Sequence, residues 1–347
     1  MKESFRKSLL EWYQKNKRDL PWRQTRDPYV IWITEIIFQQ TRIEQGLPYY
    51  YRFIEKFPDI QSLARATEDE VMKVWQGLGY YSRARNMQET AKVVAEQFQG
   101  VFPEDYSALK KLKGIGDYTA SLIASVCFGQ PYAVLDGNVF RVVSRIKSIS
   151  EPINTTGGKK VFQQECNSLL DKQNPGDFNQ AMMELGALIC KPQQPECPVC
   201  PVADFCMAFK QNTQVTFPVK LPREKLKERF LSFIFIRSGE KILIGKRNTN
   251  DIWKSLYQLP LIEKQKPEGI TKEEITQLLD IHVNEVKIIA ETTHLLTHRK
   301  LYISFYEAMV ENEIDASNGY NWVESNMLRN YAFPKPVERF LDKFLKE

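Results

Sequence analysis

Apolar residues recur at helical spacing through the first part of the chain. Residues 4–16 place Phe5, Leu9, Leu10, Trp12 and Tyr13 at helical spacing, which predicts an amphipathic opening helix. Residues 29–41 are almost wholly apolar apart from Glu35 and a polar Gln-Gln-Thr end. A helix that is apolar all round is buried, and burial favours the protonated form of a carboxyl group. Glu35 is therefore either a structural acid paired with an arginine or a general acid.

A break in the helical pattern marks residues 106–147. Gly114 and Gly116 stand two residues apart and precede a helix that carries small residues on its packing face. A glycine hairpin that leads into a helix N-terminus points backbone N–H groups outward, which suits a phosphate. Such contacts position a protein on a nucleic-acid backbone without reading bases. Asp136 follows an apolar run, and we expect it to cap the next helix and to remain ionised.

The hydrophobic period changes from helical to alternating after residue 229. Strands are predicted at 230–236, 241–244, 285–290 and 300–306, with helices at 271–280 and 335–346. A chain of 347 residues is long enough for two domains. We therefore expect a mostly α region over 1–207, a linker over 208–229 and an α+β domain over 230–347.

Composition is that of an ordinary globular protein, with 43% hydrophobic and 26% charged residues. No apolar run approaches the roughly 18 residues that a membrane span needs. The opening residues lack the apolar core of a signal peptide. These features predict a cytoplasmic protein with no membrane partner.

Positive charge is concentrated in the linker rather than spread over the chain. The net charge is +5, and residues 208–229 alone hold six basic residues against two acidic ones. A polyanion could follow this stretch. From charge alone, a solvated linker is the better interpretation.

Four of the six cysteines form one run, C-x6-C-x2-C-x5-C, at Cys190, Cys197, Cys200 and Cys206. In a cytoplasmic chain this density indicates a metal site and not disulfides. Four prolines hold the intervening loop open, as thiolates that converge on one centre require. Zinc and an iron–sulfur cluster both accept four cysteines.

The order of these motifs resembles that of the MutY-type adenine DNA glycosylases over essentially the full length. The resemblance is carried by Glu35-Ile-Ile-Phe-Gln-Gln-Thr41, by Gly77-Leu-Gly-Tyr-Tyr-Ser-Arg-Ala-Arg-Asn86, by the glycine hairpin, by Leu135-Asp-Gly-Asn-Val139, by Phe178-Asn-Gln-Ala-Met-Met-Glu-Leu-Gly-Ala187 and by the cysteine run. It implies a helix-hairpin-helix glycosylase with two helical subdomains, and a [4Fe–4S] cluster on Cys190, Cys197, Cys200 and Cys206.

The resemblance also implies a role for individual residues. Glu35 would protonate a flipped adenine, Asp136 would stabilise the sugar cation, and Tyr118 and Asn138 would support them. Gln40 and Tyr80 would wedge into the duplex, and Gly114 and Gly116 would contact the DNA backbone. Trp22, Arg23 and Glu184 would bind substrate, the last two by lining the adenine pocket. The implied substrate of this expected monomer is double-stranded DNA with adenine opposite 8-oxoguanine or G.

The two acids suit this chemistry. Breaking an N-glycosidic bond needs a proton on a poor leaving group and a negative charge near an oxocarbenium-like carbon. Glu35 in apolar company can hold the proton, whereas Asp136 at a helix start can supply the charge.

The second domain resembles the Nudix-like recognition domain of the same family. Residues 272–275 lack the accompanying acids of a Nudix box, so pyrophosphatase activity is not expected. The segment His294-Leu-Leu-Thr-His298 resembles a family loop that contacts 8-oxoguanine. Leu296 and Thr297 stand where Phe and Ser are common, and together with His298 they are the expected lesion-binding residues.

Two other functions compete with this interpretation. A glycosylase with strand-nicking lyase activity needs a lysine nucleophile, and lyases of this fold carry it where this chain has Tyr118. A non-catalytic, cluster-bearing DNA-binding regulator would gain nothing from Glu35 and Asp136, because carboxylates repel phosphates. Both alternatives are therefore disfavoured.

Overall fold

The chain folds into two compact units. The computed structural model describes residues 1–222, 225–248, 251–310 and 319–344, so Arg223 and Glu224 of the predicted linker lie outside the described residues. The first unit gathers Met1–Tyr50, Phe57–Ala64 and Glu89–Pro222, and the second gathers Tyr51–Lys56, Arg65–Gln88 and Arg223–Glu347. Residues 65–88 thus pack with the C-terminal part of the chain.

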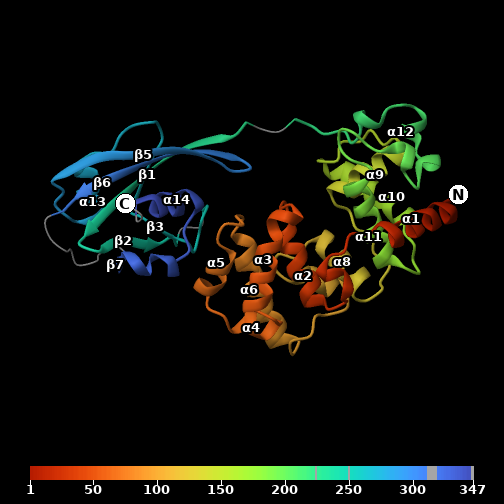
Figure 1. The fold of residues 1–347 in the computed structure, drawn as a ribbon, viewed down its shortest axis with the longest axis horizontal. Helices are drawn as coiled ribbons and strands as arrows, with labels where there is room; N and C mark the ends of the chain where they lie inside the picture. Colours follow the sequence, from red (N-terminus) through yellow and green to blue (C-terminus); the bar gives the residue numbers. More distant parts are fainter. Residues whose placement is uncertain (223–224, 249–250, 311–318, 345–347) are drawn as a thin grey trace. The chain divides into compact units, whose positions relative to one another are not determined.

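Helices account for most of the chain up to residue 222 (Figure 1). They are α1 (Lys2–Asn16), α2 (Pro28–Phe38), α3 (Ile43–Lys56), α4 (Ile60–Arg65), α5 (Glu68–Trp75), α6 (Ser82–Gln97), α7 (Tyr106–Lys111), α8 (Asp117–Val126), α9 (Gly137–Lys147), α10 (Thr156–Leu169), α11 (Pro175–Leu188) and α12 (Met207–Lys210). Short 3-10 turns include Pro21–Gln24, Cys197–Val199 and Ala203–Phe205.

Local capping explains where the key helices begin. Asp27 accepts a hydrogen bond from the Tyr29 amide and Pro28 occupies the first position of α2. Asp136 caps α9, as predicted, by accepting from the Val139 amide. Gly114 adopts a left-handed backbone with φ of 79°, which a residue with a side chain would rarely adopt, and so turns the chain from α7 into α8.

The second unit is built on a mixed sheet. Its strands are β1 (Lys227–Ser238), β2 (Lys241–Lys246), β3 (Tyr257–Gln258), β4 (Leu261–Lys264), β5 (Glu285–Leu295), β6 (Arg299–Met309) and β7 (Tyr320–Glu324), in the order β3-β2-β1-β6-β5, with β4 on β1 and β7 on β2. The central pair β1 and β6 is parallel, whereas the β5–β6 pair is antiparallel. Helices α13 (Lys272–Leu279) and α14 (Lys335–Phe344) complete this domain.

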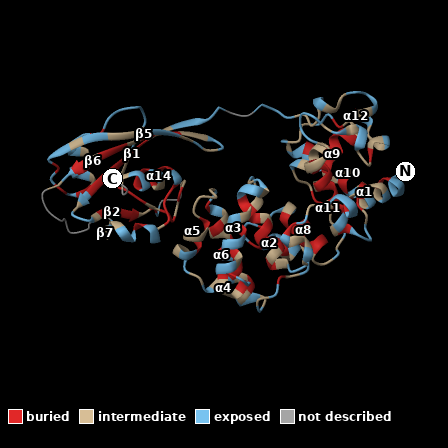
Figure 2. Ribbon diagram, in the orientation of Figure 1, coloured by how far each residue is buried: buried red, intermediate tan, exposed pale blue. Residues whose placement is uncertain are grey.

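Each unit buries its own apolar core, shown in red in Figure 2. In the first unit, α1, α9, α10 and α11 contribute most of one core, with Leu9, Val143 and Phe162 almost fully buried. In the second, Phe305 stacks on Phe340 of α14 with ring centroids 4.1 Å apart and on Phe233 at 5.6 Å. Aromatic stacking therefore fixes α14 against the central strands.

The predicted fold class is confirmed, with a helical region followed by an α+β domain. The four predicted strands and both predicted helices are present, although residues 345–346 of the last helix lie outside the described residues. The prediction missed the short strands β3, β4 and β7, and β1 begins earlier than predicted, at Lys227. Within the described ranges, every helix is too short or too polar to cross a membrane.

Candidate active site and cysteine loop

Glu35 and Tyr118 meet in the first unit, on helices α2 and α8. The Tyr118 hydroxyl donates a hydrogen bond to Glu35 Oε2 at 2.5 Å and lies 3.7 Å from the Met183 sulfur. Burial raises the pKa of Glu35 to about 7; the Tyr118 hydrogen bond opposes this shift and the negative charge of Asp136 adds to it. Glu35 can therefore carry a proton near neutral pH.

Asp136 is held rigidly at the start of α9. Its Oδ1 accepts from the Val139 amide at 2.7 Å and its Oδ2 accepts from Asn138 Nδ2 at 2.9 Å. Burial raises the pKa of Asp136 above its ordinary value, and the hydrogen bonds from Val139 and Asn138 offset only part of that shift.

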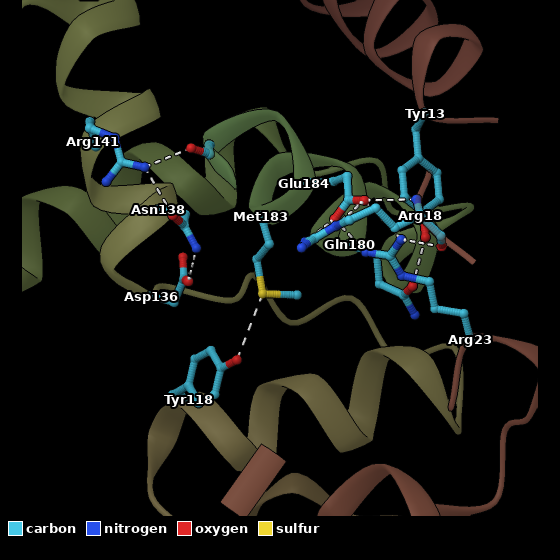
Figure 3. Close-up of polar contacts among 11 residues, drawn as sticks. Tyr13, Arg18, Arg23, Tyr118, Asp136, Asn138, Arg141, Gln180, Met183 and Glu184 are labelled. Carbon is cyan, nitrogen blue, oxygen red and sulfur yellow. Dashed lines mark hydrogen bonds and ion pairs between the residues drawn. The ribbon is translucent and has the colours of Figure 1, made fainter. Parts of the chain in front are cut away.

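Arg141 lies beside Asn138, the partner of Asp136, as Figure 3 shows, and it also contacts the start of the cysteine loop. Arg141 Nη2 donates to Asn138 Oδ1 at 2.9 Å and to the Gly186 carbonyl at 2.7 Å. Arg141 Nε donates to the Cys190 carbonyl at 2.7 Å. A Cβ atom at Gly186 would lie 2.6 Å from Asn138 Cβ, so a glycine is needed for this close approach. Sequence reasoning missed Arg141, because nothing in its local pattern distinguishes it from a surface arginine.

Glu184 of α11 lies almost fully buried between two arginines, as Figure 3 shows. Arg23 contacts its two oxygens at 3.0 and 2.5 Å, and Arg18 contacts them at 2.9 and 2.7 Å. Burial alone would raise the pKa of Glu184, but the hydrogen bonds from Arg18 and Arg23 lower it to about 2. The structure thus brings the predicted Arg23 and Glu184 together and adds Arg18, which the sequence analysis missed.

The other predicted residues of the first unit lie at its surface or edge. Trp22 packs against Phe38 and Tyr50, with ring centroids 4.7 and 5.3 Å apart. Gln40 is exposed just after α2 and has a left-handed backbone with φ of 58°. Gly114 and Gly116 are both exposed at the hairpin, which leaves their backbone open to a ligand.

The remaining predicted residues lie in the second unit, around one cavity of about 770 Å³. Tyr80, Leu296, Thr297 and His298 all line it. The Tyr80 and Thr297 hydroxyls are hydrogen-bonded to each other. His294, at the end of β5, is half-buried, and burial lowers its pKa, with further lowering by Arg339 and Lys335.

The four cysteines of the run surround a second, smaller cavity together with Arg145 and Gln214. Arg145 is 1% exposed, and its guanidinium donates to the carbonyls of Gln214, Lys191 and Pro192 and lies 3.3 Å from Cys190 Sγ. Among the described residues the Arg145 guanidinium has carbonyl groups and a thiol as partners and no carboxylate, although a buried charge is costly when nothing balances it. A cluster held by four thiolates carries the balancing negative charge, so these residues fit such a group.

The loop does not present a preformed site for a single metal ion. Within the part of the chain that the structure describes, no group of three or more His, Cys, Asp or Glu side chains is close enough to hold a metal ion. The four cysteines nevertheless line one cavity.

Comparison with known proteins gives the family. A model of the HhH-GPD superfamily of base excision DNA repair proteins matches residues 33–170, and a NUDIX domain model matches residues 232–343. An adenine DNA glycosylase of Buchnera aphidicola subsp. Acyrthosiphon pisum is 32% identical over 349 residues, covering 99% of this chain and 98% of the relative. The adenine DNA glycosylase of Homo sapiens is 31% identical over 398 residues, covering 97% of this chain and 73% of the relative.

Two solved structures resemble the helical part of the chain. A thermostable thymine-DNA glycosylase superposes with a TM-score of 0.56 and 30% identity, covering 60% of this chain and 97% of that one. An endonuclease III in a non-covalent DNA complex gives a TM-score of 0.52 at 24% identity, over 62% of this chain and 99% of that one, and so shows a shared fold. The resemblance found in the sequence is confirmed, and the chain belongs to the MutY-type adenine DNA glycosylases.

Proposed function

We propose that this protein hydrolyses the N-glycosidic bond of adenine mispaired with 8-oxoguanine or G in double-stranded DNA, as a step of base excision repair. One observation carries the proposal: Glu35, with a pKa raised to about 7, is hydrogen-bonded to Tyr118 while a second carboxyl group, Asp136, acts on its charge. Burial raises the pKa of both groups, but Asp136 accepts hydrogen bonds from Val139 and Asn138 that favour its ionised form. A proton donor together with a carboxylate is what this bond cleavage requires.

The roles of the residues follow from their contacts. Glu35 Oε2 accepts the hydrogen bond from the Tyr118 hydroxyl. The other oxygen, Oε1, would therefore carry the proton to a ring nitrogen of the flipped adenine. The C1′–N9 bond then breaks, its electron pair stays with adenine, and the sugar becomes an oxocarbenium-like cation. Asp136, fixed by Val139 and Asn138, faces that cation with negative charge until water adds to C1′.

The base-binding part of the site is proposed to be the buried Glu184–Arg23 pair. Its carboxylate accepts from amino groups and its guanidinium donates to ring nitrogens, which matches the edge of adenine. Gly114 and Gly116 would hold the DNA backbone, and Gln40 and Tyr80 would enter the duplex. Leu296, Thr297 and His298 would contact 8-oxoguanine on the opposite strand.

The reaction is proposed to stop at base release. Tyr118 occupies the position from which a lysine could form a Schiff base, and its hydroxyl is engaged with Glu35. Changing Tyr118→Lys should introduce strand cleavage that borohydride traps as a covalent adduct. Absence of any adduct would show that position 118 does not face the reacting carbon.

The cofactor is proposed to be a [4Fe–4S] cluster on Cys190, Cys197, Cys200 and Cys206, with Arg145 as the nearby balancing charge. When bound, such a cluster supplies iron–thiolate bonds that cross-link the loop over 190–206. Purified protein should be brown, and Cys200→Ser should lose iron. A colourless, fully active preparation with stoichiometric zinc would contradict this assignment.

We also propose the domain boundaries predicted above, with a catalytic domain over 1–207, a linker over 208–229 and a recognition domain over 230–347, in a monomer that acts on nucleoid DNA in the cytoplasm. The experiment that tests the function is single-turnover cleavage on duplexes that hold A opposite 8-oxoguanine, G or T. Release of adenine from the first two is expected, and absence of release from all three would refute the proposal.

The lesion contacts have their own test. Changing Thr297 and His298 together to Ala should reduce the preference for 8-oxoguanine:A over G:A by about tenfold, the worth of one or two good hydrogen bonds. An equal loss on both substrates would instead assign this segment to general affinity or folding.

A further inference from the structure

Residues 65–88 form a helical hairpin that packs with the sheet domain inside the second unit. The hairpin consists of α5, the loop 76–81 and the first turns of α6. Tyr80, the proposed wedge, stands at its tip. Contacts on both helices determine the conformation of this loop.

The first turn of α5 is held by an ion pair and two hydroxyl groups. Lys246 Nζ lies 2.6 Å from Asp69 Oδ1 and 3.4 Å from Glu68 Oε2. Tyr257 donates to Asp69 Oδ2 at 3.1 Å, and Ser255 donates to Glu68 Oε1 at 2.8 Å. Acids in a first helical turn also suit the helix dipole, so these contacts reinforce the start of α5.

The other end of α5 is held independently. Lys73 Nζ donates to the Tyr331 carbonyl at 3.1 Å, and the Gln76 side-chain amide donates to Glu338 of α14. Lys73 and Glu338 are both partly buried, which lowers the pKa of Lys73 and raises the pKa of Glu338.

The start of α6 is held by a strained loop. Arg85 Nη1 donates to the Lys254 carbonyl at 2.6 Å. The residues on either side, Trp253 and Ser255, have left-handed backbones with φ of 62° and 70°. Such conformations persist only where the surroundings enforce them, and here they present the Lys254 carbonyl and the Ser255 hydroxyl to the hairpin.

At the tip, Tyr80 also has a left-handed backbone, with φ of 49°. The Arg83 guanidinium lies over the rings of Trp75 and Tyr80, at 5.2 and 5.4 Å from their centroids. Trp75 Nε1 donates to the Gly79 carbonyl at 3.0 Å. The loop conformation therefore depends on where α5 ends.

We propose that the sheet domain clamps the hairpin 65–88 and that Asp69 and Lys246 are positioning residues for Tyr80. The inference rests on the proposed function only for the role of Tyr80 in the duplex. By holding α5 at both ends, the sheet domain fixes the loop 76–81 before DNA arrives, so that lesion contact and wedge insertion are coupled through one rigid body.

The strength of the clamp should depend on salt. Asp69 and Lys246 are 47% and 29% exposed at their side chains, so their attraction is screened by ions. A clamp of this kind holds the loop while remaining able to release it.

Hydrogen exchange of the loop amides in the free, full-length protein tests the clamp without any reference to catalysis. The Leu78 amide bonds to the Trp75 carbonyl and the Arg83 amide to the Tyr80 carbonyl, so exchange of these amides reports on loop opening. Lys246→Met and Asp69→Asn should each raise exchange at 76–83 by about fivefold or more, while peptides of α9 and α11 stay unchanged. Raising salt from about 50 mM to about 1 M should likewise increase exchange at 76–83 in the wild type. In Lys246→Met, where the ion pair is already absent, added salt should change this exchange little.

Three further variants make the test specific. Tyr257→Phe removes one hydroxyl and keeps the ring, so it should give a smaller rise without a risk of misfolding. The charge swap Asp69→Lys with Lys246→Asp should restore part of the protection relative to either single change, because it re-creates the pair in reverse although Glu68 stays beside position 246. Lys266→Met, which removes the same charge from an exposed site of the same domain, should change nothing.

The functional consequence is measured as the rate of adenine release from duplex DNA. Lys246→Met should slow adenine release opposite 8-oxoguanine more than opposite G, by about threefold to tenfold, and the charge swap should recover part of it. Unchanged exchange at 76–83, or an equal rise in every peptide, would overturn the clamp even in an active enzyme. An inactive wild type that still showed the exchange pattern would instead refute the proposed function and leave the clamp standing.

Discussion

Glu35 on α2 and Glu184 on α11 are both acids with mostly apolar neighbours in the sequence, yet their pKa values move in opposite directions, to about 7 and about 2. Burial raises both. Glu35 accepts one hydrogen bond from the Tyr118 hydroxyl, whereas Glu184 accepts hydrogen bonds from the guanidinium groups of Arg18 and Arg23. The comparison teaches that burial sets the cost of a charge and that partners from distant segments decide whether the charge persists.

The largest effect is expected when Glu35 of this pair loses its acidic proton. Glu35→Gln should reduce adenine release about a thousandfold, because the amide keeps the size of the side chain but has no acidic proton to donate. Affinity for the mispaired duplex should stay nearly unchanged. Single-turnover kinetics and fluorescence anisotropy measure the two quantities, with the exposed Glu11→Gln as control. Appreciable turnover of Glu35→Gln would remove Glu35 from the role of acid.

The next effect concerns stability around Glu184. The double change Arg18→Met and Arg23→Met should cost about 3–5 kcal/mol in urea unfolding at pH 7, because it leaves a buried carboxylate without a counter-charge. Adding Glu184→Gln should recover much of that loss. The folded pKa of about 2 lies below the ordinary 4.5, so the contribution of this cluster is complete above about pH 4.5 and is lost as the pH falls through about 2. A loss under about 1 kcal/mol would mean that the arginines are not needed to hold the charge.

Glu35 should show the opposite dependence. Its folded pKa of about 7 lies above the ordinary 4.5, so the folded state holds the proton more tightly and loses stability as the pH rises through about 7. Glu35→Gln should therefore stabilise the protein at pH 8 by at most about 3 kcal/mol. The gain should vanish below about pH 4.5. Equal unfolding curves at both pH values would indicate that Glu35 is not desolvated.

The rate of adenine release should follow the same titration. Above about pH 7 the rate should fall about tenfold per pH unit, because only the protonated form of Glu35 donates. Single-turnover rates measured from pH 5 to 9 at a fixed ionic strength would reveal the falling limb. A flat profile across this range would assign proton donation to another group.

The smallest expected effect is a shift of that limb. The Tyr118 hydrogen bond lowers the pKa of Glu35, so Tyr118→Phe should raise it and move the falling limb to higher pH by up to about one unit, the worth of a single hydrogen bond. The position of the limb, rather than the rate itself, is the measurement. A shift in the opposite direction would contradict the hydrogen bond seen in the structure.

The sequence revealed the acids better than their partners. Glu35 and Asp136 could be predicted because a carboxyl group in an apolar run, and an acid at a helix start after a glycine hairpin, are locally unusual. Arg18 lies 166 residues from Glu184, and Arg145 lies 45 residues from Cys190. Their local sequences are those of ordinary basic surface residues, and only tertiary packing gives them a role.

The fold was predictable to a similar degree. Long alternating segments such as β1 and β6 could be recognised, whereas β3, with two residues, is too short to show a period. The direction of Asp136's pKa shift could not be obtained either, since it depends on how closely the rest of the site excludes water.

The parallel pairing of β1 with β6 has a consequence for synthesis on the ribosome. Residues 65–88 emerge early, but the strand that completes the centre of their unit, Arg299–Met309, emerges more than two hundred residues later. At about 5–20 residues per second, that delay is on the order of ten to forty seconds. During this interval Glu68, Asp69 and the loop with Tyr80 lack their final contacts, so the hairpin reaches its final conformation only after the sheet domain has been synthesised.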